Sequence, residues 1–92
     1  MNRFRDSLLR LKVEAGSGST IHRCTHQMVK LARQLNVVVE CEFNACELFA
    51  YPEHISGDAL AEAYNQAVQI WHDRGSPERF KPMAFSDGSH SP

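Results

Sequence analysis

The stretch NVVVECEFNACELFAYP, residues 36–52, decides the fold, because apolar and polar side chains alternate on both sides of Asn44. A two-residue period is typical of strands that bury one face. With Asn44 and Ala45 as the central turn residues, the two halves form a hairpin. One side pairs Phe43 with Cys46, Cys41 with Leu48 and Val39 with Ala50, and the other pairs Glu42 with Glu47, Glu40 with Phe49 and Val38 with Tyr51. We expect the first side to face the core and the glutamates to face water or a basic neighbour.

A helix is predicted before this hairpin. Ser19 or Thr20, after the break GSGST, can serve as the N-cap, and Asn36 can close the helix in the left-handed conformation. The predicted buried stripe consists of Ile21, Cys24, Met28, Leu31, Ala32 and Leu35.

A second helix is predicted after the hairpin. Ser56 is its expected N-cap, with Ile55 and Leu60 forming a hydrophobic staple, and Gly75 with Pro77 ends it. Its expected buried stripe consists of Leu60, Tyr64, Ala67, Val68 and Trp71.

The segment LRLKVEA, residues 9–15, alternates like a half-buried strand, although a helix from Arg3 to Val13 competes with this interpretation. As a parallel strand it could offer Arg10 and Lys12 to Glu40 and Glu42. The sequence therefore predicts a small α/β (α+β) single domain over residues 1–75. Its order is β-α-β-β-α, with two helices packed on one face of a hairpin sheet. Residues 76–92, rich in Gly, Ser and Pro, are expected to form a flexible C-terminal tail.

Composition restricts the functional classes. The 92 residues are 42% hydrophobic and 23% charged, without a repeat, an apolar stretch of membrane-spanning length or an N-terminal apolar leader. Three cysteines, an odd number, argue against a disulfide framework. These features favour a cytosolic protein with reduced thiols.

Four motifs could carry chemistry, and each has a simpler structural interpretation. In HRCTH, His22 and His26 share a helix face while Cys24 points to the core, so a metal site would need a third ligand from Cys41, Cys46, His54 or His72. Cys41 and Cys46 are diagonal neighbours on the hairpin, which suits buried thiols better than a disulfide. Glu40, Glu42 and Glu47 lack an evident cleft for acid–base catalysis. GSGST lacks the lysine and the spacing of a P-loop. We therefore expect no enzyme activity, no catalytic residue, no metal and no cofactor.

Charge is the more informative feature. Residues 1–34 carry seven Lys/Arg and two Asp/Glu, whereas residues 35–92 carry three and nine. The exposed face of the first predicted helix holds Arg23, Lys30 and Arg33, and the basic residues Arg3, Arg5, Arg10 and Lys12 precede it. Solvation alone explains most charged helix faces, but such a set also suits phosphates or an acidic protein.

The segment HRCTHQMVKLARQLNVVVECEFNACELFAYPEHISGDALAEAYNQAV, residues 22–68, resembles small accessory proteins encoded by phages. The shared pattern is an amphipathic helix, a Glu/Phe/Asn hairpin ending in Pro, and a second helix, covering about half of the chain. Length and charge layout are most similar to the anti-CRISPR proteins that act on type I-F CRISPR-Cas surveillance complexes.

This resemblance implies a non-catalytic inhibitor in the cytoplasm of the infected bacterial host. Its partner would be a Cas protein/crRNA ribonucleoprotein complex, with contacts that can include the crRNA backbone, and binding would block recognition of target DNA. That group shares no functional motif, so the expected binding residues rest on the charge argument alone. The balanced net charge departs from strongly acidic DNA mimics. A small phage nucleic-acid-binding regulator using the same basic helix face remains an alternative, and a metal-dependent or thiol enzyme is a third.

Overall fold

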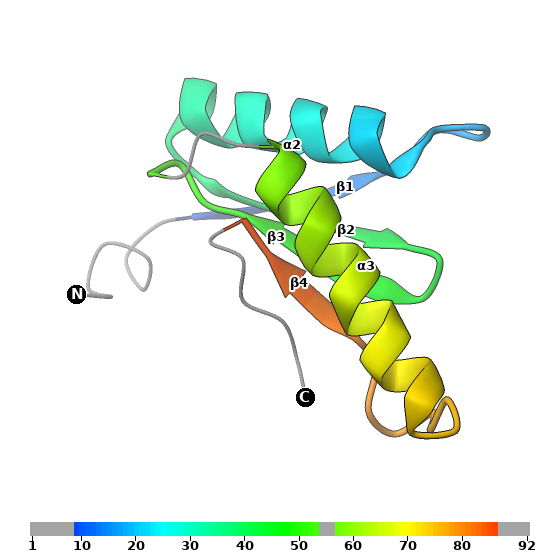
Figure 1. Cartoon of the computed structure of the whole chain (residues 1–92). Helices are drawn as coiled ribbons and strands as arrows, with labels where there is room; N and C mark the ends of the chain where they lie inside the picture. The colour runs from blue at the N-terminus through cyan, green and yellow to red at the C-terminus, as the bar shows by residue number, and fades with distance from the viewer. Residues whose placement is uncertain (1–8, 54–56, 87–92) are drawn as a thin grey trace.

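The computed structural model describes residues 9–53 and 57–86 of the chain. Its elements are β1 (Arg10–Glu14), α2 (Ile21–Leu35), β2 (Val38–Phe43), β3 (Cys46–Ala50), α3 (Gly57–Asp73) and β4 (Met83–Phe85). The strands form one sheet in the order β1-β2-β3-β4, and both helices pack on the same face of it (Figure 1). The predicted α/β class and two-helix layer are confirmed, with β4 following the predicted β-α-β-β-α order.

The hairpin between β2 and β3 has the predicted register. Cys41 lies opposite Leu48, Glu42 opposite Glu47, and Phe43 opposite Cys46. Asn44 and Ala45 form the turn with φ of 48° and 66°, as a two-residue type I′ connection requires. The apolar side of the hairpin belongs to the hydrophobic core, as expected.

Residues 10–14 form a strand, so the competing helix is wrong for this segment. β1 pairs parallel with β2, and Lys12 lies opposite Glu40. The side chain of Arg10 reaches Glu40, with 3.6 Å between Nη1 and Oε2. The expected attraction between a basic β1 and an acidic β2 is confirmed for Arg10. Lys12 forms no ion pair with any residue in the described part of the chain.

The prediction of a flexible tail over residues 76–92 is wrong for its middle part, because β4 pairs parallel with β3. Backbone hydrogen bonds of 2.9 Å join Glu47 N to Pro82 O and Ser86 N to Phe49 O. The hydroxyl of Ser86 also accepts a hydrogen bond of 2.9 Å from Tyr51 N, and Ala84 is completely buried. The domain therefore continues past residue 75 to at least Ser86, and residues 87–92 lie outside the described part.

The helix ends follow the predicted signals where they are described. Thr20 caps α2 by accepting a hydrogen bond of 3.2 Å from Arg23 N, and Asn36 closes α2 in the left-handed conformation. Gly75, with φ of 84°, follows α3 and donates to His72 O at 3.0 Å. The predicted N-cap Ser56 lies outside the described residues. No helix in the described part is long and apolar enough to cross a membrane.

The buried stripe of α2 is rotated relative to the prediction. Cys24, Met28 and Ala32 are buried as expected, but Leu35 is 54% exposed while Thr25 and Val29 are buried. The rotation arises because α3 packs beside α2, so that α2 must bury a flank against α3 as well as the side that lies on the sheet.

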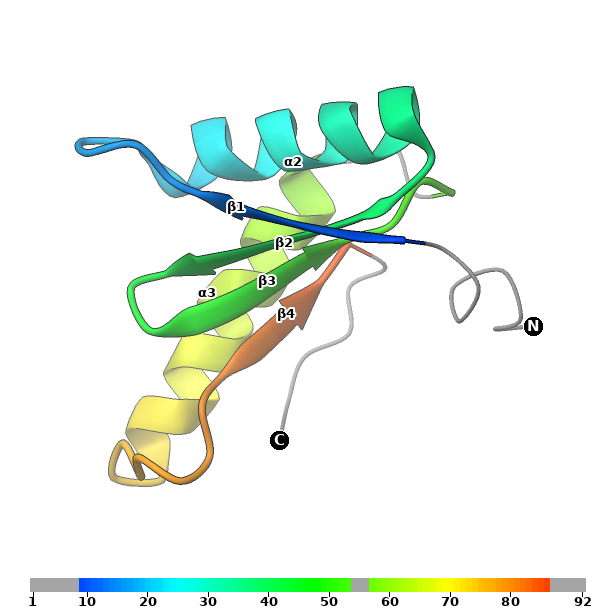
Figure 2. The same cartoon turned by 180° about the vertical axis from the view of Figure 1, so that it is seen from behind.

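The two β-α-β units of the domain run in opposite directions because the β2–β3 hairpin reverses the chain. Since both crossover helices share one face, one crossover must be left-handed. Figures 1 and 2 identify it as β3–α3–β4. Such connections are right-handed in nearly all proteins, so this unit is an unusual feature of the fold.

Candidate functional site

Helix α2 carries the cations that the sequence singles out. Arg23, Lys30 and Arg33 are exposed, and α2 contains no Asp or Glu. None of the three forms an ion pair with a residue in ranges 9–53 and 57–86. Arg23 and Lys30 are seven residues apart, so they lie on one line about 10 Å apart along the helix. The α2 ridge, defined as these three cations, is a narrow basic strip with its charges directed at solvent.

An open groove of about 530 Å³ runs beside this ridge, between α2 and the start of α3. It is lined by His26, Val29, Lys30, Arg33, Gln34 and Gly57. The helices approach closely here: a Cβ atom at Gly57 would lie 2.8 Å from Cα of His26. Only glycine fits this contact without displacing a helix. The groove thus combines two cations with an apolar floor at Val29.

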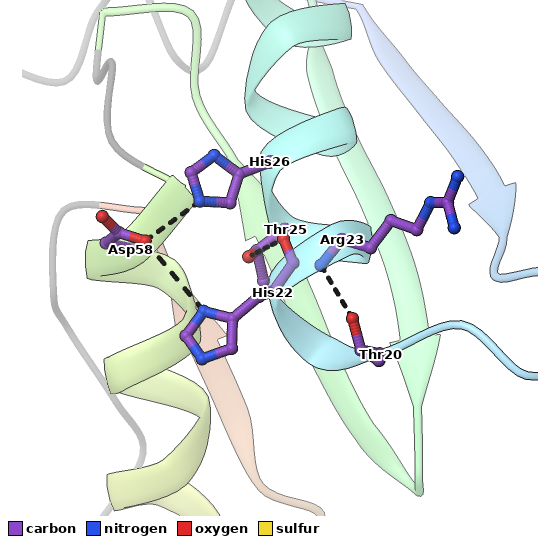
Figure 3. A network of polar contacts seen from close by, with 6 residues as sticks. All are labelled: Thr20, His22, Arg23, Thr25, His26 and Asp58. Atoms are coloured by element: carbon purple, nitrogen blue, oxygen red, sulfur yellow. Dashed lines mark hydrogen bonds and ion pairs between the residues drawn. The ribbon is translucent and has the colours of Figure 1, made fainter.

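The histidines of HRCTH join the two helices, as Figure 3 shows. Nε2 of His26 lies 2.9 Å from Oδ1 of Asp58, and Nδ1 of His22 lies 4.0 Å from the same oxygen. Asp58 sits in the first turn of α3, where a carboxylate also favours the positive end of the helix dipole. Cys24 belongs to the core, as predicted. Within the described residues, no group of three or more His, Cys, Asp or Glu side chains is arranged to hold a metal, and His54 lies outside this part.

Arg10 and Lys12, the basic residues of the N-terminal segment that the structure describes, do not join the α2 ridge. Arg10 contacts Glu40 and lies 6.0 Å from the ring centroid of Phe49, on the sheet face that the helices leave uncovered. Lys12, two residues further along β1, lines a small hollow with Glu40, Glu42 and Glu47 on that face. The structure therefore separates Arg10 and Lys12 from the ridge by the thickness of the sheet. Arg3 and Arg5 lie outside the described residues.

The sheet face opposite the helices carries acidic and aromatic side chains. Glu42 and Glu47 face each other across the hairpin. Further along β3, Phe49 stacks on Phe85 with 5.0 Å between ring centroids, and Tyr51 stacks on Phe85 at 6.1 Å. The hollow beside the glutamates is only about 30 Å³. Among the residues that the structure describes, this hollow is too small to enclose a substrate beside the glutamates.

The three cysteines are free and buried. Burial is the main reason why the pKa of Cys46 is raised to about 12, with the charge of Glu47 second. Burial likewise raises the pKa of Cys24 to about 12, followed by the charge of Cys41 and a hydrogen bond to it. Sequence reasoning missed this contact, in which the Sγ atoms of Cys24 and Cys41 lie 3.8 Å apart. The alternation of β2 predicts that Cys41 faces a helix, but it does not predict which turn of that helix Cys41 contacts.

The loop GSGST before α2 forms a local turn. Ser19 N donates to Gly16 O at 3.1 Å, and Gly18 adopts φ of 81°. Thr20 already occupies one of the free amides of the first turn. A local turn and a helix cap therefore account for these residues.

Comparisons of this chain with protein-family models, with curated proteins and with solved structures find no match.

Proposed function

We propose that this chain is a phage anti-CRISPR inhibitor that binds the Cas protein/crRNA surveillance complex of type I-F systems without catalysis. In this proposal the α2 ridge contacts phosphates of the complex, and the bound protein blocks recognition of target DNA in the cytoplasm of the infected host. The observation that carries the proposal is the ridge itself. Arg23, Lys30 and Arg33 project from one helix with no carboxylate partner among the described residues.

Exposed apolar side chains support a partner that contains protein. Leu9 is 77% exposed and Leu11 37% exposed at the edge strand β1, and Leu35 is 54% exposed at the end of α2. Leu9 lies near the end of α2, because Val38, three residues after Leu35, donates a backbone hydrogen bond of 2.9 Å to Leu9 O. Naked nucleic acid offers phosphates but little aliphatic surface, whereas a ribonucleoprotein offers both.

The state of the candidate catalytic groups supports a non-catalytic role. A nucleophilic cysteine needs a thiolate, and burial raises the pKa of Cys24 and of Cys46 to about 12. The glutamates of the hairpin line only a shallow hollow. Binding therefore accounts for the exposed features better than acid–base or thiol chemistry does.

The test is co-elution of the purified chain with a reconstituted type I-F complex on a size-exclusion column at physiological salt. We expect stoichiometric co-elution and loss of target-DNA binding. The variant R23E/K30E/R33E should bind at least about a hundredfold more weakly, since three charge-assisted contacts are replaced by repulsion. Its far-UV circular dichroism should not change, because all three side chains are exposed.

The matched control is R74E/R79E/K81E, which makes the same charge change at three exposed cations outside α2. This control should inhibit like the parent protein. Equal inhibition by both variants would show that the α2 ridge is not the binding surface. Absence of co-elution with an active complex would show that the type I-F complex is not the target. A naked RNA or duplex DNA that binds as tightly as the complex would instead favour the nucleic-acid-binding regulator.

A further inference from the structure

In the core below the first two turns of α2, the sulfur atom of Cys24 lies close to the sulfur atoms of Cys41 and Met28. The Sγ atoms of Cys24 and Cys41 lie 3.8 Å apart, and Sγ of Cys24 lies 3.9 Å from Sδ of Met28. Cys24 and Met28 belong to α2, whereas Cys41 comes from β2. All three side chains are buried, with exposed fractions of 6%, 2% and 2%.

A cavity of about 150 Å³ leads to these sulfur atoms. Cys24, Met28 and Cys41 line it together with the end of β1, the loop before α2, Gln27 and Leu31. Its outer residues Glu14, Gly16 and Gln27 are exposed, so solvent reaches its rim. Two thiols in van der Waals contact also lie near 3.8 Å, so the spacing alone does not define a site. The cavity and the third sulfur atom are the independent observations.

The spacing suits a small soft metal ion. With metal–sulfur bonds of about 2.3 Å, ligands in a tetrahedral or trigonal arrangement lie about 3.8 to 4.0 Å apart. The two sulfur–sulfur distances from Cys24, 3.8 Å to Cys41 and 3.9 Å to Met28, fall in this range. Thiolate and thioether ligands together select Cu(I), whereas the structural Zn²⁺ sites of proteins use four Cys or His ligands.

We propose that Cys24, Cys41 and Met28 form a Cu(I) site reached through this cavity. The two cysteines bind as thiolates and the methionine as a neutral thioether. Cu⁺ replaces the two S–H protons, which pass to solvent, so the centre carries one negative charge and no electron is transferred. Cys24 lies in the first turn of α2, where the positive end of the helix dipole stabilises that charge.

The experiment is an anaerobic titration of the full chain, kept reduced, with Cu(I) in competition with the chromogenic chelator bicinchoninate. We expect one equivalent of Cu(I) to be withdrawn from the chelator and an X-ray absorption spectrum with sulfur neighbours only. Cys24→Ala should lower the affinity at least about a hundredfold, and Met28→Leu, which keeps the volume, about tenfold. Circular dichroism shows whether each variant is folded.

Cys46→Ala is the matched control, because Cys46 is equally buried on the core face but does not line the cavity. This variant should bind Cu(I) like the parent chain. The proposal is overturned if the parent chain withdraws no Cu(I), or if Cys46→Ala loses as much affinity as Cys24→Ala. It is also overturned if Met28→Leu, folded like the parent, binds with unchanged affinity and an unchanged absorption spectrum. None of these outcomes bears on the α2 ridge, so this test is independent of the proposed function.

Discussion

The close contact between Gly57 and His26 allows the spacing of α2 and α3 to be tested by the single substitution Gly57→Ala, which adds one methyl group. In Gly57→Ala, the added Cβ would lie 2.8 Å from both Cα and Cγ of His26 and 2.9 Å from its backbone nitrogen. A side chain could rotate away, but a backbone atom in the middle of α2 moves only if the helix moves. The substitution therefore forces α3 and α2 apart.

The expected cost follows from two opposed effects. Inserting a methyl group into a packed contact destabilises a protein by about 1 to 3 kcal/mol. Alanine is a better helix former than glycine by up to about 1 kcal/mol within a helix, and less so at Gly57, the first residue of α3. We expect a net loss of about 2 kcal/mol, which lowers the Tm of a domain of this size by about 8 to 16 °C.

Urea denaturation followed by far-UV circular dichroism measures this loss. Gly16→Ala is the matched control, since its Cβ would meet only Oγ of Ser19 at 3.6 Å, an ordinary contact. It should leave the stability unchanged or raise it by a few tenths of a kcal/mol, because alanine restricts the unfolded chain. If Gly57→Ala proved as stable as the parent, the close approach of α2 and α3 would be wrong, and with it the groove beside the ridge.

Two further predictions concern the hairpin and the thiols. Ala45 adopts φ of 66°, so Ala45→Gly should raise the free energy of unfolding by about 1 kcal/mol in urea denaturation; a loss of stability would mean that the turn is not of type I′. Burial raises the pKa of Cys24 and of Cys46 from 9.0 to about 12, which lowers their thiolate fraction at pH 8 about a thousandfold. Iodoacetamide should therefore modify these thiols far more slowly in the folded chain than in urea, and equal rates would contradict their burial. The free energy of unfolding should fall above pH 9, because there only the thiols of the unfolded chain ionise.

Local signals made much of the fold predictable. The hairpin register follows from alternation around Asn44, and the ends of α2 follow from Thr20 and Asn36, because each of these patterns acts over a few residues. Strand β4 was missed for the opposite reason. Met83–Phe85 is too short to show a period, it follows Pro82, and it is held by pairing with β3 across a left-handed crossover that general rules disfavour.

Tertiary packing sets those parts of the candidate site's geometry that local patterns do not determine. The cations of α2 could be identified from helical spacing, but grouping Arg10 and Lys12 with them ignored the alternation of β1. That alternation turns Arg10 and Lys12 away from the face that carries Val13 and the helices. The exposure of Leu35 and the contact between Cys24 and Cys41 depend on how α2 is rotated and placed over β2, which no pattern within α2 determines.

The small number of cations on the ridge limits what kind of partner could bind the proposed surface tightly. Three phosphate contacts give a slope of log affinity against log salt of about −2 for a single strand and about −3 for a duplex. This slope is much shallower than that of proteins that bind DNA by charge alone. Even those proteins bind naked DNA weakly at physiological salt when they do not read its bases.

Helix α3, on the other side of the groove, carries Asp58, Glu62 and Asp73 and no Lys or Arg. A long polyanion that extended from the ridge across α3 would therefore meet carboxylates. A partner that binds tightly must place only a few phosphates against α2 and gain the rest of its affinity from protein contacts, such as those that Leu35 and the edge strand β1 can offer. This requirement fits a ribonucleoprotein surface, in which the RNA backbone is exposed over short distances, better than it fits free nucleic acid.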